Sequence, residues 1–279
     1  MPSSRGRMLG GIRHRPFPLL KKEELVAAAP DVPATVRLTF GLHADDAVLG
    51  FGQPNTAVKA RPPGSWVRSR PYSICSDPGR PGSFDLLVKL YPGGRVCGHL
   101  GRLQVGESAW LARTRSKPMA ADVSRAGLIA FGIGISDCIQ TATALLVGGA
   151  DEVRLMHAVR TAAEVTLADE VTALALRHPG RFHATYFLSR EPAGSDMRQL
   201  AGSAAVVRGR LDRAALEAAF GGWARDTAFM VVGTREMNQA VYHQLREMGL
   251  CRLLVGFRGT EPPPVARGGG KEDFAKALL

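Results

Sequence analysis

A glycine-containing turn between an apolar segment and a helix-like segment is the stretch of this sequence best suited to binding a ligand. It reads GLIAFGIGISDCIQ, residues 127–140. Gly132 and Gly134 let the backbone approach a ligand closely, as in the strand, turn and helix of a dinucleotide-binding domain. Ile133 and Asp137 stand where such a site favours small or neutral side chains. A carboxylate at a helix start is a good cap and suits the helix dipole, but the same charge would oppose a bound pyrophosphate.

The histidines and cysteines do not form a pattern typical of a metal site or a nucleophilic site. The histidines without acidic or cysteine partners at ligand spacing are His157, His178, His183 and His243. The four cysteines are far apart and form no CxxC pair; they are Cys75, Cys97, Cys138 and Cys251. We expect reduced, mostly buried thiols in a cytosol or an organelle interior rather than a disulfide framework. No metal ligand and no catalytic residue is assigned.

The chain is strongly basic, with a net charge of +11 and a pI of about 10.1. A basic surface favours acidic partners, such as an acidic electron-transfer protein, RNA or an anionic membrane face. An arginine-rich composition without a specific partner is an equally good interpretation. Because the signatures of nucleic-acid-binding folds are absent, we expect no DNA partner and disfavour RNA. No apolar run approaches membrane-spanning length, so no transmembrane segment is expected.

The N-terminal segment MPSSRGRMLGGIRHRPFPLLKK, residues 1–22, contains arginine and lysine but no acid. This composition is typical of a mitochondrial targeting segment, and the continuous apolar centre of a signal peptide is absent. A basic arm that stays on the mature protein would have the same composition. We expect a mitochondrial protein, with the cytoplasm as the alternative.

Short alternating segments separated by turns predict an antiparallel β-barrel in the first half of the chain. ATVRLTF places Val36, Leu38 and Phe40 on one face, and FDLLVKLY, residues 84–91, alternates in the same way. The turn-rich stretches GFGQPN, RPPGS and SDPGRPGS lie between these segments. A small barrel over residues 32–122 is therefore expected.

The second half of the chain alternates strands with helices, which predicts a parallel, doubly wound sheet. The expected strands are GLIAFG, EVRLMHAV, FHATYFLS and AFMVVG, and the expected helices follow the glycine turn or lie in TLADEVTALALRHPG and REMNQAVYHQLREMG. In the last helix, Met237, Val241, Leu245 and Met248 form an apolar stripe that we interpret as core packing. An irregular basic stretch separates the last two expected strands.

The order of motifs resembles that of the ferredoxin–NADP reductase superfamily, and most closely NADH–cytochrome b5 reductase. RPYS, residues 70–73, is followed by FDLLVKLYPGGRVCGHLGRLQVGE, which matches the family's strand, glycine pair, small helix and L-x-x-G-[DE] in order. The similarity extends from about Val32 to Phe257. It implies a basic N-terminal extension over 1–31, an FAD-binding barrel over 32–122, an NAD(P)-binding-like α/β domain over 123–257 and a C-terminal extension over 258–279.

The resemblance implies an FAD site on the barrel. Arg70 would pair with the pyrophosphate, Tyr72 would pack on the flavin and Ser73 would hydrogen-bond near its reactive nitrogen. The glycine pair would direct helix N–H groups at the FAD phosphates. Cys97 replaces the family's serine or threonine and donates a hydrogen bond poorly, and ARTRSK replaces the family's G-P-x-G turn. The implied FAD-binding residues are Arg70, Pro71, Tyr72, Ser73, Lys89, Gly93, Gly94, Val96 and Cys97.

The glycine turn aligns with the family's G-G-x-G-I-T-P motif, which receives the NADH pyrophosphate and nicotinamide. Ile133 replaces a threonine of that motif, and Asp137 replaces its proline. Val232 replaces the cysteine of a C-G-P-x-x-M segment beside the nicotinamide, and Arg160, which is retained, could approach the adenosine side. The implied NAD(P)-binding residues are Gly132, Gly134, Ser136, Gly233 and Met237.

Two functions of different classes follow from these features. The first is an FAD-dependent NAD(P)H oxidoreductase of cytochrome b5 reductase type, in which NADH or NADPH reduces FAD and electrons pass to an acidic heme protein or similar acceptor. The second is a reductase-like accessory subunit of a larger mitochondrial assembly, supported by the altered nucleotide motifs and by both terminal extensions. RNA binding is a weaker third hypothesis, because no base-reading element is present.

Overall fold

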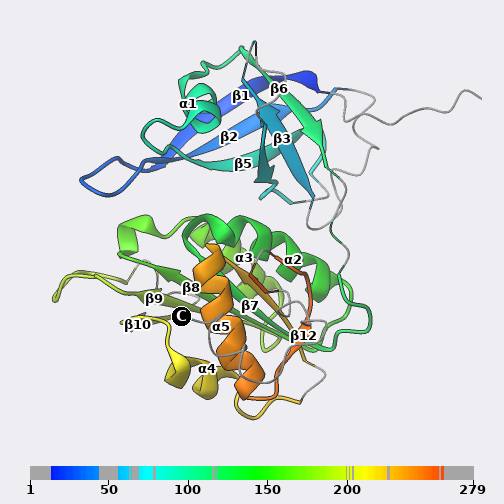
Figure 1. Ribbon diagram of the computed structural model, residues 1–279, viewed down its shortest axis with the longest axis vertical. Coiled ribbons are helices and arrows are strands. Elements are labelled where there is room, and N and C mark those ends of the chain that lie inside the picture. The colour runs from blue at the N-terminus through cyan, green and yellow to red at the C-terminus, as the bar shows by residue number, and fades with distance from the viewer. Residues whose placement is uncertain are drawn as a thin grey trace, which may run out of the picture.

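The computed structural model contains two β-sheets of different type, one in each half of the chain (Figure 1). The residues that it describes are 14–43, 56–62, 64, 69–77, 80–114, 117, 119–198, 200, 202, 204–224, 227–257 and 259–260. GFGQPN and parts of RPPGS, SDPGRPGS and ARTRSK lie outside these described residues, as do residues 1–13 and 261–279.

The first sheet is antiparallel and curls until its two edge strands meet. Its strand order is β4-β3-β6-β1-β2-β5, and a bridge between Ile74 and Leu86 joins the two edges. The bounds are β1 Arg15–Val26, β2 Thr35–Gly41, β3 Ala57–Arg61, β4 Arg70–Ser73, β5 Ser83–Lys89 and β6 Ser108–Arg113. The predicted antiparallel barrel is thereby confirmed.

Alternation along the strands builds the core of the barrel. Val36, Leu38 and Phe40 of β2 are buried, and the rings of Phe40 and Phe84 stack with their centroids 5.8 Å apart. Helix α1, Arg95–Arg102, packs against the same core through its apolar side. β4 and the start of α1 are therefore both positioned by the core of the barrel.

The second sheet is parallel, with strand order β10-β9-β8-β7-β11-β12. Its bounds are β7 Arg125–Phe131, β8 Glu152–Val159, β9 Phe182–Leu188, β10 Ala205–Arg208, β11 Ala228–Val232 and β12 Arg252–Leu253. The chain moves outward from β7 through β8, β9 and β10, and then returns to add β11 on the other side of β7. The strand order reverses between β7 and β11, and ligands of open α/β sheets bind at such a switch point.

Helices cover both faces of this sheet (Figure 1). Leu128 and Ala130 of β7 pack in one core with α2 and α3, whereas Ile129 packs in another with α4 and α5. The helices are α2 Ile135–Val147, α3 Ala168–Arg177, α4 Arg213–Phe220 and α5 Arg235–Glu247. The predicted doubly wound sheet is confirmed. Within the described ranges, no helix is both long and apolar enough to span a bilayer.

Several elements differ from the sequence-based prediction. β1 lies within the expected basic extension and overlaps the expected targeting segment, because it pairs with β2 and β6. The expected irregular stretch contains β10 and α4, and Asp212 caps α4 by accepting a hydrogen bond from the Ala215 N–H at 2.9 Å. The prediction that the apolar stripe of α5 packs in the core is wrong for Met237. Its side chain is 43% exposed, whereas Val241 and Leu245 of the same helix are buried.

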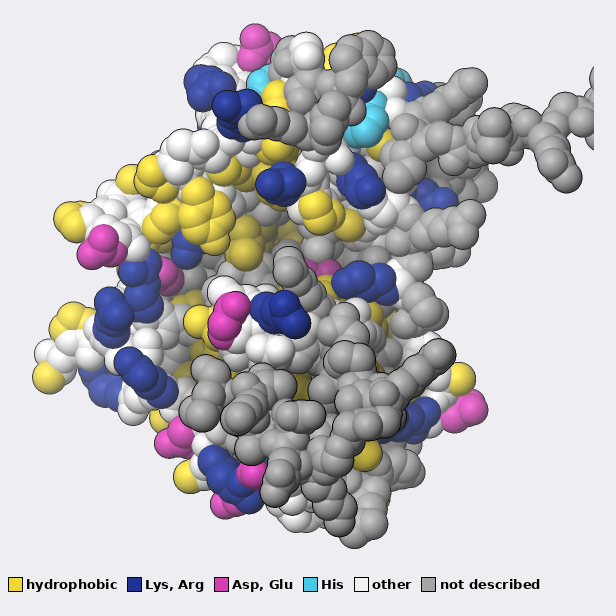
Figure 2. All heavy atoms as spheres, in the orientation of Figure 1, with side chains coloured by type: hydrophobic (Ala, Val, Ile, Leu, Met, Phe, Trp, Pro, Cys, Tyr) yellow, Lys and Arg dark blue, Asp and Glu magenta, His cyan; other side chains and the backbone are white. Residues whose placement is uncertain are grey.

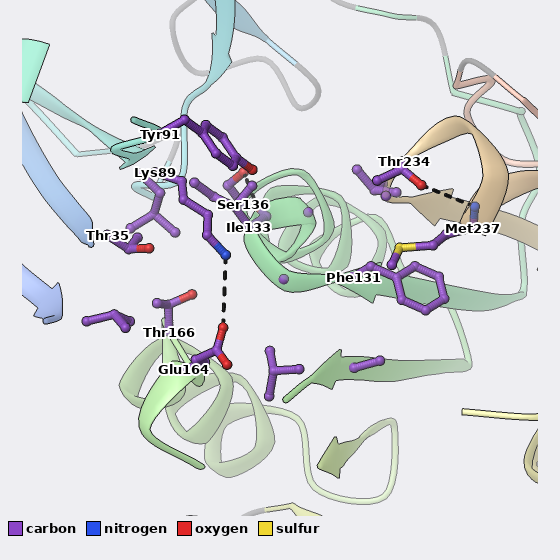
Figure 3. A pocket seen from close by; sticks show the side chains of 18 of the residues that line it. Thr35, Lys89, Tyr91, Phe131, Ile133, Ser136, Glu164, Thr166, Thr234 and Met237 are labelled. Atoms are coloured by element: carbon purple, nitrogen blue, oxygen red, sulfur yellow. Dashed lines mark hydrogen bonds and ion pairs between the residues drawn. The ribbon is translucent and has the colours of Figure 1, made fainter. Parts of the chain in front are cut away.

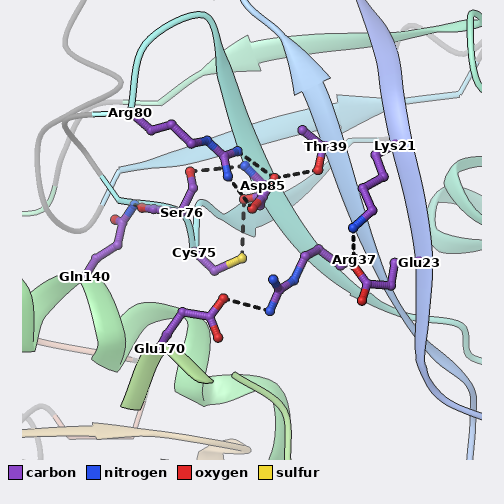
Figure 4. A network of polar contacts seen from close by, with 10 residues as sticks. All are labelled: Lys21, Glu23, Arg37, Thr39, Cys75, Ser76, Arg80, Asp85, Gln140 and Glu170. Carbon is purple, nitrogen blue, oxygen red and sulfur yellow. Dashed lines mark hydrogen bonds and ion pairs between the residues drawn. The ribbon is translucent and has the colours of Figure 1, made fainter. Parts of the chain in front are cut away.

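A buried carboxylate fixes the chain directly after β4. Asp85 is 5% exposed and accepts hydrogen bonds from Thr39 Oγ1 at 2.7 Å and from the Arg80 Nη atoms at 2.8 and 2.6 Å (Figure 4). Its backbone N–H donates to Ser76 Oγ at 3.1 Å, and its carbonyl accepts from the Cys75 N–H at 3.0 Å. Burial opposes ionisation of Asp85, but the hydrogen bonds from Arg80 and Thr39 outweigh it and lower the pKa. The network thus sets the position of the RPYS strand.

Replacing Asp85 by asparagine should lower the free energy of unfolding by about 2–3 kcal/mol at neutral pH, because charge-assisted hydrogen bonds in a buried site are weakened. The folded pKa of Asp85 is lowered, so its contribution is present above the ordinary pKa of 3.8 and is lost as the pH falls through the folded value. Denaturant titrations across this range measure both effects. The control is Asp196→Asn, which removes the exposed partner of Arg198. If Asp85→Asn and Asp196→Asn lowered the free energy of unfolding equally, the stabilising role of the buried Asp85 network would be contradicted.

Candidate functional site

A cavity of about 1280 Å³ lies between the barrel and the α/β domain (Figure 3). It exceeds the roughly 300–1,000 Å³ of an ordinary small-molecule pocket, so it has room for more than one such ligand. Every residue that the sequence predicted for cofactor binding lines it. From the barrel these are Arg70, Pro71, Tyr72, Ser73, Lys89, Gly93, Gly94, Val96 and Cys97; from the α/β domain they are Gly132, Gly134, Ser136, Gly233 and Met237. The fold brings the two sets together, and their individual roles stay predictions.

β4 presents the side chains of Arg70, Tyr72 and Ser73 to the cavity. Arg70 is exposed, and its Nη1 donates to the Ser69 carbonyl at 3.3 Å. Tyr72 is half-buried against the barrel core. Burial raises the pKa of Tyr72, the nearby Cys97 raises it further, and Arg70 offsets only part of this change. The Tyr72 hydroxyl therefore stays protonated at neutral pH and can donate a hydrogen bond.

Helix α1 begins at the cavity without a side-chain cap. Its N-cap is Gly94, no acidic residue lies in its first turn, and the N-terminal N–H groups of a helix carry partial positive charge. A Cβ on Gly94 would lie 2.2 Å from Cys97 Sγ, so the glycine permits the thiol to pack against the turn. That thiol is 3.9 Å from the Tyr91 carbonyl oxygen. An anion can approach this helix end without displacing a capping side chain.

The glycine turn is held by backbone packing and by a buried histidine. Gly132 has φ +53°, and a Cβ on Gly134 would lie 2.3 Å from the Val232 carbonyl oxygen. His157 Nε2 lies 2.9 Å from the Gly132 carbonyl. Burial lowers the pKa of His157 to about 4, so the neutral ring donates its Nε2–H to this carbonyl. Sequence analysis missed this role, because only the register that pairs Ala130 with His157 places the ring beside the turn.

A hydrogen bond crosses the cavity between Ser73 and Asp137. Ser73 Oγ donates to Asp137 Oδ1 at 2.7 Å and thereby joins β4 to the first turn of α2. The expectation that Asp137 caps α2 is wrong, because the helix begins at Ile135 after Gly134 and has no side-chain cap. Burial raises the pKa of Asp137, and the Ser73 hydrogen bond and the Lys117 charge offset only part of the rise. Asp137 is therefore less readily ionised than an exposed aspartate.

The opposite wall of the cavity is more apolar. Phe131, Ile133 and Met237 line it; in Figure 3, Phe131 and Met237 lie together at one side, and Ile133 lies beside Ser136. Ser136 Oγ donates to the Ile133 carbonyl at 2.9 Å, which fixes the turn. Thr234 Oγ1 accepts from the Met237 N–H at 3.3 Å and caps α5. This wall can accommodate a flat, uncharged ring.

A charged cluster at the cavity joins the two halves of the protein, and sequence analysis missed its central residue, Glu164. The Glu164 carboxylate accepts from Arg160 Nε at 2.8 Å and Nη2 at 3.0 Å, and lies 3.9 Å from Lys89 Nζ. Arg160 Nη1 also donates to the Asp31 carbonyl at 2.7 Å. Arg160 and Lys89 line the cavity, but both are engaged in this contact between the domains. The pair of Arg160 and Glu164 is local, but its contacts with Lys89 and Asp31 join residues that are distant in the sequence, so only the folded arrangement reveals them.

Two family models match this chain. The oxidoreductase FAD-binding domain matches residues 22–112, and the oxidoreductase NAD-binding domain matches residues 128–243. NADH-cytochrome b5 reductase 1 of Mycosarcoma maydis is 32% identical over 166 residues, covering 57% of this chain and 51% of that protein. NADH-cytochrome b5 reductase 1 of Laccaria bicolor is 29% identical over 198 residues, covering 69% and 62% respectively. The chain thus spans between about half and three-fifths of the length of these curated relatives.

Solved structures share the same fold. The cytochrome b5 reductase domain of Ulva prolifera nitrate reductase superposes with a TM-score of 0.66 at 25% identity, covering 85% of this chain and 94% of that domain. The Amycolatopsis cytochrome P450 reductase GcoB, at 22% identity, shares the fold with a TM-score of 0.63, covering 85% of this chain and 67% of its own. The chain therefore belongs to the ferredoxin reductase-type family of FAD/NAD-binding oxidoreductases and is a distant homologue of the NADH–cytochrome b5 reductases.

Proposed function

We propose that this protein is an FAD-dependent NAD(P)H oxidoreductase that passes electrons to an acidic acceptor protein. The observation that carries the proposal is one cavity lined both by the RPYS strand with the start of α1 and by the glycine turn. Bound FAD would supply the redox chemistry, accepting a hydride from the nicotinamide and releasing electrons to the acceptor. The side chains of this protein then have to hold, orient and shield the two ligands.

The barrel side of the cavity fits FAD. The Arg70 guanidinium, which donates to the Ser69 carbonyl and has no carboxylate partner among the described residues, can make a bidentate contact with the pyrophosphate. The uncapped start of α1 offers N–H groups to the same phosphates. Tyr72, protonated and backed by the barrel core, offers a ring face and a hydroxyl. Ser73 lies at the end of this row, next to the α/β domain.

The α/β side of the cavity fits a pyridine nucleotide. The backbone of Gly132–Gly134 is open to a close approach, and Phe131, Ile133 and Met237 form an apolar wall for the ring. Asp137 does not repel the nucleotide as strongly as its residue type predicts, because burial raises its pKa and favours the neutral acid. Ile133 and Asp137 are therefore compatible with an occupied nucleotide site.

The acceptor and the location of the protein are proposed from charge. A net charge of +11 favours an acidic electron-transfer protein and increases the rate of encounter with it. The composition of the N-terminal segment supports a mitochondrial location. A reductase-like accessory subunit is the alternative, and it predicts that bound flavin is not reduced by either nucleotide.

The purified protein should be yellow, and anaerobic addition of NADH or NADPH should bleach its flavin absorbance. The reason is that the cavity brings the FAD-binding and nucleotide-binding elements together. Absorbance spectra before and after each addition measure this directly. A protein that cannot be reconstituted with FAD would contradict the proposal. Flavin that stays oxidised after the addition of either nucleotide would favour the accessory-subunit role.

Arg70→Ala should weaken FAD binding by about 10–100-fold, because a charged hydrogen-bond pair with the pyrophosphate contributes about 1.5–3 kcal/mol. Equilibrium titration of the flavin-free protein with FAD measures the change. Arg102→Ala is the matched control, since Arg102 lies in the last turn of α1 and outside the cavity. Equal FAD affinity in the wild type and the Arg70 variant would refute the role of Arg70.

Asp137→Asn should stabilise the protein, and the gain should increase with pH. The folded pKa of Asp137 is raised, so its contribution to stability is fully present below the ordinary pKa of 3.8 and is lost as the pH rises through the folded value. Asparagine can still accept from Ser73 but does not ionise. The difference in unfolding free energy between variant and wild type, measured from about pH 4 to pH 8, should therefore grow. A difference independent of pH would show that Asp137 has an unshifted pKa.

A further inference from the structure

The outer face of the barrel carries a row of apolar side chains along β1. Phe17 and Leu19 are buried in the barrel core, so the alternation of the strand places Pro16, Pro18 and Leu20 on the outer face. Leu20 is 51% exposed, and Pro16 is exposed as well. Because each residue of a strand advances the chain by about 3.3 Å, the row is roughly 13 Å long.

Two further apolar side chains lie beside this row. Trp110 of β6 pairs with Pro16 and is 41% exposed, because its two neighbours in the strand point into the core. Val105 is 62% exposed, and the N–H of Gly106 after it donates to the Leu19 carbonyl at 2.8 Å. This hydrogen bond holds Val105 beside the far end of the row. The outer apolar patch comprises Pro16, Pro18, Leu20, Val105 and Trp110.

Cationic side chains border the outer apolar patch. The Arg61 guanidinium lies 5.7 Å from the centroid of the Trp110 ring, because β3 and β6 pair these two residues. Burial lowers the pKa of His14, directly before β1, and the charges of Arg61 and Lys59 lower it further. These three basic side chains therefore lie close together next to the patch. Residues 1–13, which lead into β1, contain arginine but no acid.

A second copy of this chain does not suit the outer apolar patch. In a symmetric dimer the same surface meets itself, so Lys59 and Arg61 of the two copies would lie close together and repel each other. The patch has five apolar residues, whereas each partner of a stable interface contributes roughly 20–30 residues. The occupant therefore has to be anionic and has to accept apolar side chains without a large complementary interface.

An anionic lipid surface meets both requirements. Tryptophan favours the boundary between lipid and water, and aliphatic side chains such as those of Leu20 and Val105 can enter the acyl region. Lysine and arginine near such a surface are attracted by the negative charge of its headgroups. Figure 2 shows Lys and Arg side chains on both halves of the protein, so positive charge is not confined to the cavity.

We propose that the outer apolar patch docks this protein on an anionic membrane surface, with Trp110 and Leu20 entering the interface and Lys59 and Arg61 contacting lipid phosphates. The contact is peripheral and requires no spanning segment. None of the five patch residues lines the cavity. The proposal is therefore independent of the proposed function, and it leaves the cavity accessible in the membrane-bound protein.

Sedimentation of the full chain with lipid vesicles tests this docking surface. Vesicles of phosphatidylcholine and phosphatidylserine should bind the protein more tightly than vesicles of phosphatidylcholine alone, and added salt should weaken the binding. Trp110→Ser should weaken binding by about tenfold, as should Lys59→Gln combined with Arg61→Gln. Leu176→Ser is the matched control and should bind as the wild type does, because Leu176 is a 76% exposed apolar residue on α3.

Trp110→Phe separates the role of the surface from the folding of the barrel. Its ring is still apolar, so it should keep most of the vesicle binding. It should lose the shift of tryptophan fluorescence to shorter wavelengths that anionic vesicles produce in the wild type. Equal binding to the two kinds of vesicle, or unchanged binding by Trp110→Ser, would overturn the proposal. A dimer in solution that Trp110→Ser dissociates would also overturn it, because a second copy would then cover the patch.

Discussion

The hydrogen bond between Ser73 and Asp137 is the contact on which the site depends, because it joins the last residue of β4 to the first turn of α2. The groups expected to hold FAD belong to the barrel, and the groups expected to hold the nucleotide belong to the α/β domain. The Glu164 cluster and an ion pair of 2.8 Å between Arg37 and Glu170 also join the two halves. The cavity is therefore a product of domain packing rather than of either domain alone.

The same packing sets the electrostatics of the cavity. Of the residues that the structure describes, two carboxylates line it, Asp137 and Glu164; burial favours the neutral form of the first, and the second is neutralised by Arg160 and Lys89. The Arg70 guanidinium and the uncapped start of α1 remain available to ligands. A cavity of this size with a positive balance suits two phosphate-bearing cofactors held side by side. Asp137 stands where the family motif has a proline. Because burial favours its neutral form, it opposes the binding of a phosphate-bearing ligand less than an ionised aspartate would.

The sequence predicted the two sheets well. The alternation of apolar residues in each strand, and the alternation of strands with helices, can be read from each segment by itself. The sequence also predicted residues that share one cavity, since RPYS and the glycine turn are short local motifs. The contacts between the domains were not predicted, because Ser73 and Asp137, or Lys89 and Glu164, come together only through the register of distant elements. β1 was missed, although its pairing with β2 and β6 makes it central to the barrel.

A crystal structure of the protein loaded with FAD would show where the cofactor lies relative to the contact between the domains. We expect the FAD pyrophosphate to lie against Arg70 and the start of α1, with the isoalloxazine ring on Tyr72 and within hydrogen-bond reach of Ser73. We also expect the open side of the ring to face Gly132–Gly134. Density for FAD outside this cavity, or a ring turned away from the glycine turn, would contradict the account.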